Sequence, residues 1–434
     1  MQTALRWVQL GISAFGGDPS RVTVFGQSAG GESSCDLLVR PRAGPLFHRL
    51  ICESGPLHRA SLFSPLDQLD PVYRRLVSAL GCAGAGFSGS ELVACLRAAP
   101  WDRVLNVSVA LRLEEAGAAS PLGVYGPAVD GVELRGHPAR LVEAGAFHAG
   151  KALLAGSNRD EQLPRVLTQM PRPLSAADSA APAAQEAMLS WVRPSRVAMD
   201  DAAARDMCAL YTAAAMPELC STAAADPAGD VRVRAGTGAS TSGSDADADA
   251  DCRPLVAAPM NDVMYECGTR RLFRSWVQWE GADAAFRYRF GLGLLCNGTD
   301  PLYDGGVSTQ TFGGRVSAHT YEIPFVFDTL LADSGSDSDS PAVGSFPCVW
   351  TAAQRRVALA MVRYWTCFAA TGRPSHHSCQ GAALLTEWPA FGERGLVLHI
   401  GSEFVVETPS QDARAAVACD FWDGLQAAGA RVYY

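Results

Sequence analysis

Short apolar runs alternate with amphipathic stretches along this chain of 434 residues. Arg49–Cys52 and Lys151–Ala155 are mostly apolar and bounded by turn formers, a pattern typical of strands buried on both faces of a parallel sheet. Phe286–Phe290 alternates between apolar and charged residues and predicts a further strand. Apolar residues at helical spacing predict helices over residues 4–12, 66–80, 90–98 and 355–370. Strands separated by helices indicate the α/β class.

A strand, a tight turn and a helix follow one another near the N-terminus. Arg21–Phe25 is rich in β-branched and aromatic residues, Gly26 ends it, and Glu32–Val39 has a helical pattern. The turn between them reads Gly26-Gln27-Ser28-Ala29-Gly30, which fits the Gly-x-Ser-x-Gly nucleophile elbow. In such an elbow the sharp turn exposes the serine hydroxyl and the glycines avoid clashes. The competing interpretation is a glycine-rich turn without function.

A serine nucleophile needs a histidine base, and that base needs a carboxylate to orient it. In folds that carry this elbow, the serine, the acid and the histidine follow one another along the chain, so the histidine should lie after the last sheet strand. His319 lies in a loop beyond the predicted strand Phe286–Phe290. The alternative is an ordinary loop histidine. Asp160 and Glu161 both follow the Lys151 strand, where the acid should lie, and spacing does not decide between them. Either could also be a solvated surface carboxylate.

Composition and charge exclude several classes of protein. Hydrophobic residues make up 48% of the chain and charged residues 19%, so a large globular core can form. The net charge of -9 and the absence of a basic stripe argue against nucleic-acid binding. The most apolar helical stretch, Val357–Ala370, contains Arg363 and is too short to cross a bilayer, so we expect no transmembrane segment.

Thirteen cysteines are many for a reduced cytosolic enzyme, and none of them form the paired groupings typical of zinc sites. Asn106-Val107-Ser108 and Asn297-Gly298-Thr299 are formal glycosylation acceptors. Both features favour an oxidising, secretory compartment. The first residues, however, contain no basic segment followed by an apolar run that could act as a signal peptide.

Two stretches of low complexity interrupt the globular pattern. Ala235–Asp251 is an Ala, Gly, Ser and Asp run, and Ala332–Pro341 is rich in Ser and Asp. Neither can contribute to a core, so we expect both to be disordered surface insertions.

Segments spread along nearly the whole chain resemble the type-B carboxylesterase family, which includes cholinesterases, liver-type carboxylesterases and fungal lipases. They are Ala4–Val8, Phe15–Pro19, Phe25–Gly31, Glu53–Gly55, Gly126–Gly131, Arg159–Glu161 and His319–Phe327. The resemblance implies a single α/β-hydrolase domain over residues 1–434, with a mostly parallel central sheet flanked by helices.

The resemblance also assigns roles at the site. In the family the carboxylate is the Glu of an Asp-Glu pair and the base is the His before Tyr-Glu-Ile-Pro, which implies a triad of Ser28, Glu161 and His319. The implied reaction is hydrolysis of a small-molecule carboxylic ester through an acyl-enzyme on Ser28, with the backbone N–H of Ala29 as one oxyanion donor. This chemistry needs no metal or cofactor.

The same resemblance implies disulfides. It pairs Cys82 with Cys95 and gives Cys419 a partner, for which Cys267 is the first choice and Cys252 the second.

The chain departs from the family at its N-terminal side. Family members begin well upstream of the residue that matches Met1, so we expect a truncated chain without the His-Gly-Gly-Gly-type loop that supplies further oxyanion donors. The nucleophile strand should then form an unpaired edge that includes Val22, Val24 and Phe25.

Two substitutions concern the site itself. Gln27 replaces the Glu of cholinesterases, which favours a general ester over a choline ester. Gln162 stands where the family commonly has Gly, which should slightly unsettle the loop that carries Glu161. The rival interpretations are an inactive truncated esterase and a non-catalytic binding or adhesion relative that keeps the fold.

Overall fold

The computed structural model describes twelve segments of the chain. These are residues 1–57, 63–83, 89–116, 126–170, 172–192, 199–216, 219–222, 250–294, 316–329, 351–379, 385–410 and 413–428. The insertion expected over residues 332–341 lies outside them. Most of the insertion expected over residues 235–251 also lies outside them. Its last two residues, Ala250–Asp251, form a strand, so the predicted insertion extends two residues too far.

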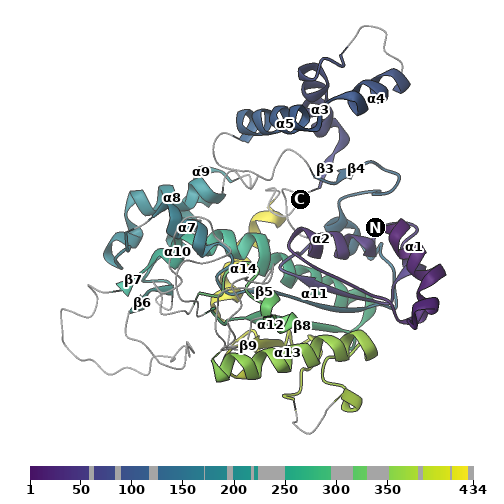
Figure 1. Ribbon diagram of the computed structural model, residues 1–434. Coiled ribbons are helices and arrows are strands. Elements are labelled where there is room, and N and C mark those ends of the chain that lie inside the picture. The colour runs from purple at the N-terminus through teal and green to yellow at the C-terminus, as the bar shows by residue number, and fades with distance from the viewer. Residues whose placement is uncertain are drawn as a thin grey trace, which may run out of the picture.

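A six-stranded sheet forms the centre of the fold (Figure 1). Its strands in chain order are β1 Thr23–Gln27, β2 Arg49–Glu53, β5 Ala152–Asn158, β8 Ala285–Phe290, β9 Val397–Ile400 and β10 Phe404–Glu407. They lie in this same order across the sheet, all parallel except β10, which runs antiparallel to β9. Two short pairs lie apart: β3 Ser64–Pro65 with β4 Ala128–Val129, and β6 Ser221–Thr222 with β7 Ala250–Asp251.

Helices surround the sheet. In chain order they are α1 Gln2–Gly11, α2 Ala29–Cys35, α3 Leu66–Ala79, α4 Gly89–Ala98, α5 Trp101–Ala116, α6 Pro138–Glu143, α7 Leu163–Gln169, α8 Pro182–Val192, α9 Asp201–Leu210, α10 Arg253–Asn261, α11 Cys267–Glu280, α12 Ile323–Phe327, α13 Ala352–Thr371 and α14 Ala413–Ala427. A π-helical turn, Asp262–Glu266, joins α10 to α11. Within the described segments, no helix has both the length and the apolar character needed to span a bilayer.

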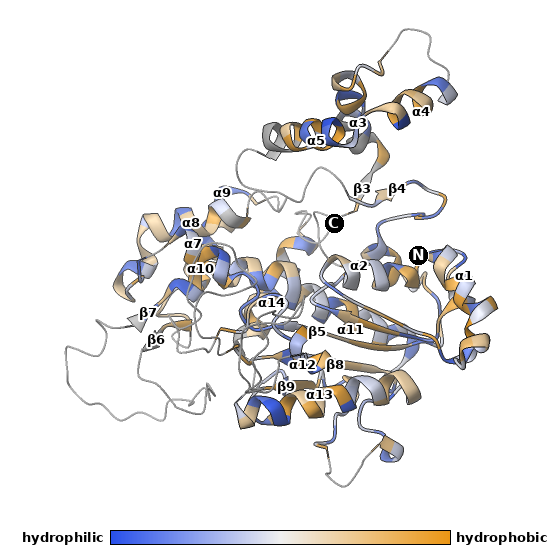
Figure 2. Cartoon of the chain, in the orientation of Figure 1, coloured by the Kyte–Doolittle hydropathy of each residue, from blue (hydrophilic) through white to orange (hydrophobic). Residues whose placement is uncertain are grey.

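Alternate residues of the central strands face two separate apolar clusters. Leu50 and Leu153 pack on one face of the sheet with Trp276 of α11. Ile51 and Leu154 pack on the other face with aromatic and aliphatic side chains of α13. In Figure 1, α2 and α11 lie on one side of the sheet and α12 and α13 on the other. Burial on both faces is why the apolar runs Leu50–Cys52 and Ala152–Ala155 form the middle of these strands. Figure 2 shows the central strands mainly in orange.

The strands and helices that the apolar pattern predicts are present, with shifts of a few residues at their ends. β1 begins two residues later than predicted and continues to Gln27, directly before the nucleophile candidate. It pairs only with β2 among the described strands, and Phe25 on it is 51% exposed. The expected unpaired edge is therefore seen.

Helices α3, α4 and α5 form a small unit that stands away from the sheet (Figure 1). The disulfide between Cys82 and Cys95 joins the loop after α3 to α4, and Val77 and Leu80 pack around it. The pairing implied by the family resemblance is thus present in the structure.

The second implied disulfide, between Cys267 and Cys419, joins α11 to α14. Cys252, the second-choice partner of Cys419, is bonded to Cys220 instead. The described segments contain two more disulfides that the sequence did not suggest, Cys35–Cys52 and Cys367–Cys379.

Candidate active site

Ser28 lies at the point where β1 turns into α2. Its φ of 55° and ψ of −123° are unusual for a residue with a side chain. Two backbone hydrogen bonds hold this conformation: the Ser28 N–H donates to the Glu53 carbonyl at 2.9 Å, and the Ser28 carbonyl accepts from the Glu32 N–H at 2.9 Å. Such strain persists only where the surroundings fix it, and it concentrates at functional sites.

The glycines around Ser28 differ in how much space a side chain would have at each position. A Cβ on Gly26 would lie 2.5 Å from the carbonyl carbon and oxygen of Gly30, and a Cβ on Gly31 would lie 2.8 Å from the Glu53 carbonyl oxygen. A Cβ on Gly30 would meet no described atom within 4 Å. The expectation that the motif glycines avoid clashes is therefore right for Gly26. It is wrong for Gly30, whose side-chain position is open.

Glu161 and His319 lie in direct contact. Glu161 Oε2 is 2.5 Å from His319 Nδ1, and Glu161 Oε1 accepts a hydrogen bond of 2.8 Å from the Asn158 N–H at the end of β5. Glu161 is 1% exposed, whereas the His319 side chain is 17% exposed. Asp160 turns elsewhere: it pairs with Arg159 and accepts from the Ser317 N–H. Of the two acids between which spacing does not decide, Glu161 is therefore the one that contacts His319.

The other ring nitrogen of His319 lies beside Gln27. Gln27 Nε2 is 3.2 Å from His319 Nε2 and 3.5 Å from Nδ1. The two distances are nearly equal, so the amide lies over the face of the ring. The structure therefore brings the candidate acid and the candidate base into contact, with the Ser28 elbow at the same edge of the sheet.

Loops at the carboxyl ends of parallel strands position these groups. Ser28 follows β1, Glu161 follows β5, and His319 lies in the segment 316–322 that returns to the sheet after β8. Open α/β sheets bind their ligands at this edge. Thr320, the residue after the candidate base, has a φ of 79°, so a second strained residue lies beside the site.

Gln162, which the sequence led us to expect would unsettle the acid loop, is held in place. Its N–H donates to Asn261 Oδ1 at 3.2 Å, and its side-chain amide donates to the Tyr265 hydroxyl at 3.2 Å. The Tyr265 ring in turn lies 5.3 Å from the His319 ring, centroid to centroid. The π-helical turn and α10 thus supply partners for Gln162 that the sequence does not reveal.

Two buried carboxyl groups under the site were not identified from the sequence. Burial, together with nearby Glu322, raises the pKa of Glu53 to about 8, and Trp365 Nε1 donates to Glu53 at 2.5 Å. Burial, together with nearby Glu161, raises the pKa of Glu322 to about 7, and Asn158 donates to it at 2.5 Å. For Glu53 the available signal was an acidic residue directly after the apolar run Leu50–Cys52 in β2.

The expected oxyanion donor, Ala29, is the first residue of α2. No side chain caps this helix end, so its first N–H groups face the site without a side-chain partner among the described residues. The positive end of the helix dipole favours negative charge there. Within the described residues no group of three or more His, Cys, Asp and Glu side chains could hold a metal ion.

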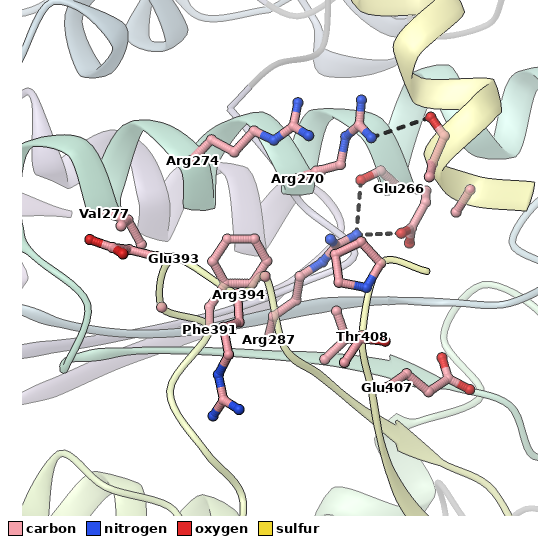
Figure 3. Close-up of a pocket in the computed structure, with 16 residues that line it drawn as sticks. Glu266, Arg270, Arg274, Val277, Arg287, Phe391, Glu393, Arg394, Glu407 and Thr408 are labelled. Atoms are coloured by element: carbon pink, nitrogen blue, oxygen red, sulfur yellow. Dashed lines mark hydrogen bonds and ion pairs between the residues drawn. The ribbon is translucent and has the colours of Figure 1, made fainter. Parts of the chain in front are cut away.

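A separate cavity of about 220 Å³ lies between α11, α14 and the β9–β10 region (Figure 3). Arg270, Arg274 and Phe391 line it, and Glu266 bonds to Arg287 at its side. Neither the elbow nor the acid–base pair contributes to its lining. Arg270 and Arg274 form ion pairs with Asp423 that attach α14 to α11.

Comparison with known proteins identifies the family of the chain. Residues 1–422 match the model of the carboxylesterase family. The chain is 34% identical to pyrethroid hydrolase Ces2a of Mus musculus and 35% identical to acylcarnitine hydrolase of Rattus norvegicus, each over 158 residues. It is 33% identical to liver carboxylesterase 1 of Mus musculus over 165 residues. Each match covers 36% of this chain, but only 25%, 25% and 28% of the respective relatives, so the matched part spans about a quarter of their length. The chain belongs to the carboxylesterase family and has its α/β-hydrolase fold.

Proposed function

We propose that this protein hydrolyses carboxylic esters through an acyl-enzyme formed on Ser28. The observation that carries the proposal is the buried Glu161–His319 pair, which lies at the same edge of the sheet as the strained Ser28 elbow. A carboxylate, an imidazole and a serine hydroxyl at one edge of the sheet are the parts of a serine hydrolase. The names of the relatives, two hydrolases and a carboxylesterase, support the same class of reaction.

In the proposed reaction His319 accepts the Ser28 proton while Ser28 attacks the ester carbonyl. The tetrahedral oxyanion receives a hydrogen bond from the Ala29 N–H, and collapse releases the alcohol, which takes the proton from His319. Water activated by the same histidine then attacks the acyl-enzyme and releases the acid. Glu161 fixes the ring and stabilises its positive charge in both transition states.

Hydrolysis of p-nitrophenyl butyrate tests this function. We expect Ser28→Ala to lower kcat/KM by at least about 10³-fold, since removal of a serine nucleophile leaves only the residual catalysis of the site. Ser33→Ala, which makes the same change on the other side of α2, should keep the wild-type rate. Equal rates for wild type and Ser28→Ala, in samples that are folded by circular dichroism, would contradict the proposal and favour a non-catalytic relative.

We also propose that the protein folds in the secretory pathway. The described residues contain five disulfides, which persist in oxidising compartments and are rare in the cytosol. Asn106 of the Asn-Val-Ser triplet is exposed on α5, where a glycan could attach. Expression in a secreting eukaryotic host should yield a product whose mass falls on treatment with an N-glycosidase; retention of all protein in the cytosol would contradict the assignment.

A further inference from the structure

We propose that the disulfide between Cys35 and Cys52 positions the nucleophile elbow for catalysis. This inference rests on the proposed function, because its effect is expressed through the reactivity of Ser28. The bond joins the last residue of α2 to β2, the strand next to the one that leads into the elbow. Ser28 directly precedes the first residue of the same helix. The disulfide therefore holds one end of a helix of seven residues, and the nucleophile lies at the other end.

The start of α2 lies against the end of β2 through backbone contacts. The Ser28 N–H donates to the Glu53 carbonyl at 2.9 Å. A Cβ on Gly31 would lie 2.8 Å from the same carbonyl oxygen, and a Cβ on Gly55 would lie 2.6 Å from the Ser28 carbonyl oxygen. These distances leave no room for a side chain, so the helix start and the segment Glu53–Gly55 are in direct contact.

The disulfide adds a covalent attachment at the far end of the helix. Cys52 is the residue before Glu53, so the two ends of α2 are attached to neighbouring residues of one strand. In the parallel ladder Gly26 pairs with Cys52, and Gln27 pairs with Glu53. The two strand residues that hold α2 therefore also hold the last two residues of β1 before the nucleophile.

A helix as short as α2 needs such support. Seven residues are too few for a helix to be stable on its own, and among the described residues no side chain caps this one at Ser28. The φ of 55° at Ser28 is a strained conformation that persists only where the surroundings fix it. Without the disulfide, the contacts at the helix start alone must resist tilting of α2. Tilting would displace both the Ser28 hydroxyl and the Ala29 N–H, the proposed nucleophile and oxyanion donor.

The burial of the disulfide determines which substitutions test it. Cys35 is 0% exposed and Cys52 is 1% exposed, and both belong to the apolar cluster that contains Leu37, Leu50 and Leu153. Serine in place of either cysteine would put a hydroxyl into this core, which costs stability for a reason unrelated to the bond. Apolar residues of similar volume remove the bond and keep the packing.

Cys35→Ala with Cys52→Val is such a variant. A displacement of about 1 Å can cost an enzyme about 10²-fold in rate, so we expect kcat for p-nitrophenyl butyrate to fall by about 10- to 100-fold. KM should stay close to the wild-type value, because the change acts on the reacting groups and not on ground-state binding. The rate at which a fluorophosphonate modifies Ser28 should fall by the same factor as kcat.

Cys82→Ala with Cys95→Ala is the matched control. These cysteines are 13 residues apart, and Cys35 and Cys52 are 17 apart, so the two bonds close loops of similar length. Removal of either bond should therefore lower the stability of the fold to a similar extent. The control bond lies in the unit of α3, α4 and α5, so its removal should leave kcat unchanged. Equal kcat values for the two double variants, both folded by circular dichroism, would overturn the positioning role.

Amide hydrogen exchange tests the same point without turnover. Peptides that contain Ser28 should exchange faster in Cys35→Ala with Cys52→Val than in the control, because the bond from Ser28 to Glu53 opens when α2 tilts. Cys35→Val with Cys52→Ala serves as a second variant should the first misfold.

Two results would overturn the proposal: equal exchange of these peptides in the variant and the control, or a digest of unreduced wild type without a peptide that links Cys35 to Cys52. Failure of the proposed function gives a different result. Wild type and Ser28→Ala would then hydrolyse the ester at equal rates, while the difference in exchange would persist.

Discussion

Glu161 makes two hydrogen bonds with His319, one through its side chain and one through its backbone carbonyl. Its side chain accepts from the ring Nδ1 at 2.5 Å, and its backbone carbonyl accepts from the His319 N–H at 3.3 Å. The second carboxylate oxygen is occupied by the Asn158 N–H, which ties the pair to the end of β5. The orientation of the proposed base is therefore set by the backbone of a buried central strand as well as by one side-chain contact.

We expect Glu161→Gln to lower kcat for ester hydrolysis by about 10³- to 10⁴-fold, because an amide can leave the ring in the wrong tautomer. Asp160→Asn is the matched control, since Asp160 accepts from the Ser317 N–H and does not contact His319. Its kcat should stay within about tenfold of wild type. Similar losses in the two variants would show that the loop, and not the Glu161 carboxylate, supports the reaction.

The glycines of the elbow give a second matched pair. A Cβ at Gly26 would lie 2.5 Å from the Gly30 backbone, so Gly26→Ala must displace the turn and should cost about 1–3 kcal/mol of stability. Gly30→Ala meets no described atom, so its free energy of unfolding should equal or slightly exceed that of wild type. Denaturant unfolding checks both variants. Equal destabilisation by the two changes would contradict the described packing of the elbow.

Glu53 should make the protein less stable as the pH rises. Its pKa is raised to about 8 in the folded state from an ordinary value of 4.5, so the folded protein keeps a proton that the unfolded chain loses. The stabilisation is fully present below pH 4.5 and is lost as the pH increases to about 8. Glu53→Gln is neutral at every pH and can still accept from Trp365. The stability of this variant relative to wild type should therefore rise between pH 5 and pH 8, with a slope of at most ~1.4 kcal/mol per pH unit. A difference that does not depend on pH would mean that Glu53 is ionised in the folded protein.

The disulfides should differ in how much they stabilise the fold. Cys267 and Cys419 are 152 residues apart, whereas Cys82 and Cys95 are 13 apart. A longer closed loop restricts the unfolded chain more, so Cys267→Ser with Cys419→Ser should cost about 2–5 kcal/mol and more than the corresponding change at Cys82 and Cys95. Chemical denaturation of the two double variants provides the comparison. A larger loss from the shorter loop would show that local packing outweighs loop closure here.

The apolar pattern was sufficient to predict the central strands, because β2 and β5 are buried on both faces and carry few polar residues. It was insufficient for β9 and β10. These strands have four residues each, and His399 and Glu407 within them pair with one another across the antiparallel ladder. The order of elements alone would consequently have favoured His399, on the later strand, as readily as His319. The choice of His319 depended on the motif that follows it.

Contacts between distant segments could not be predicted from the sequence. The π-helical turn places Tyr265 against His319, and α13 places Trp365 on Glu53. Neither arrangement leaves a periodic signal, because each depends on how a helix packs across the sheet.

The central claim is that Ser28 is the nucleophile, and active-site labelling tests it most directly. The folded protein is treated with a fluorophosphonate, digested, and analysed by mass spectrometry. We predict a single covalent adduct on Ser28, with labelling strongly slowed in His319→Ala and unaffected in Ser33→Ala. An adduct on a different serine, or no adduct on a folded sample, would contradict the account.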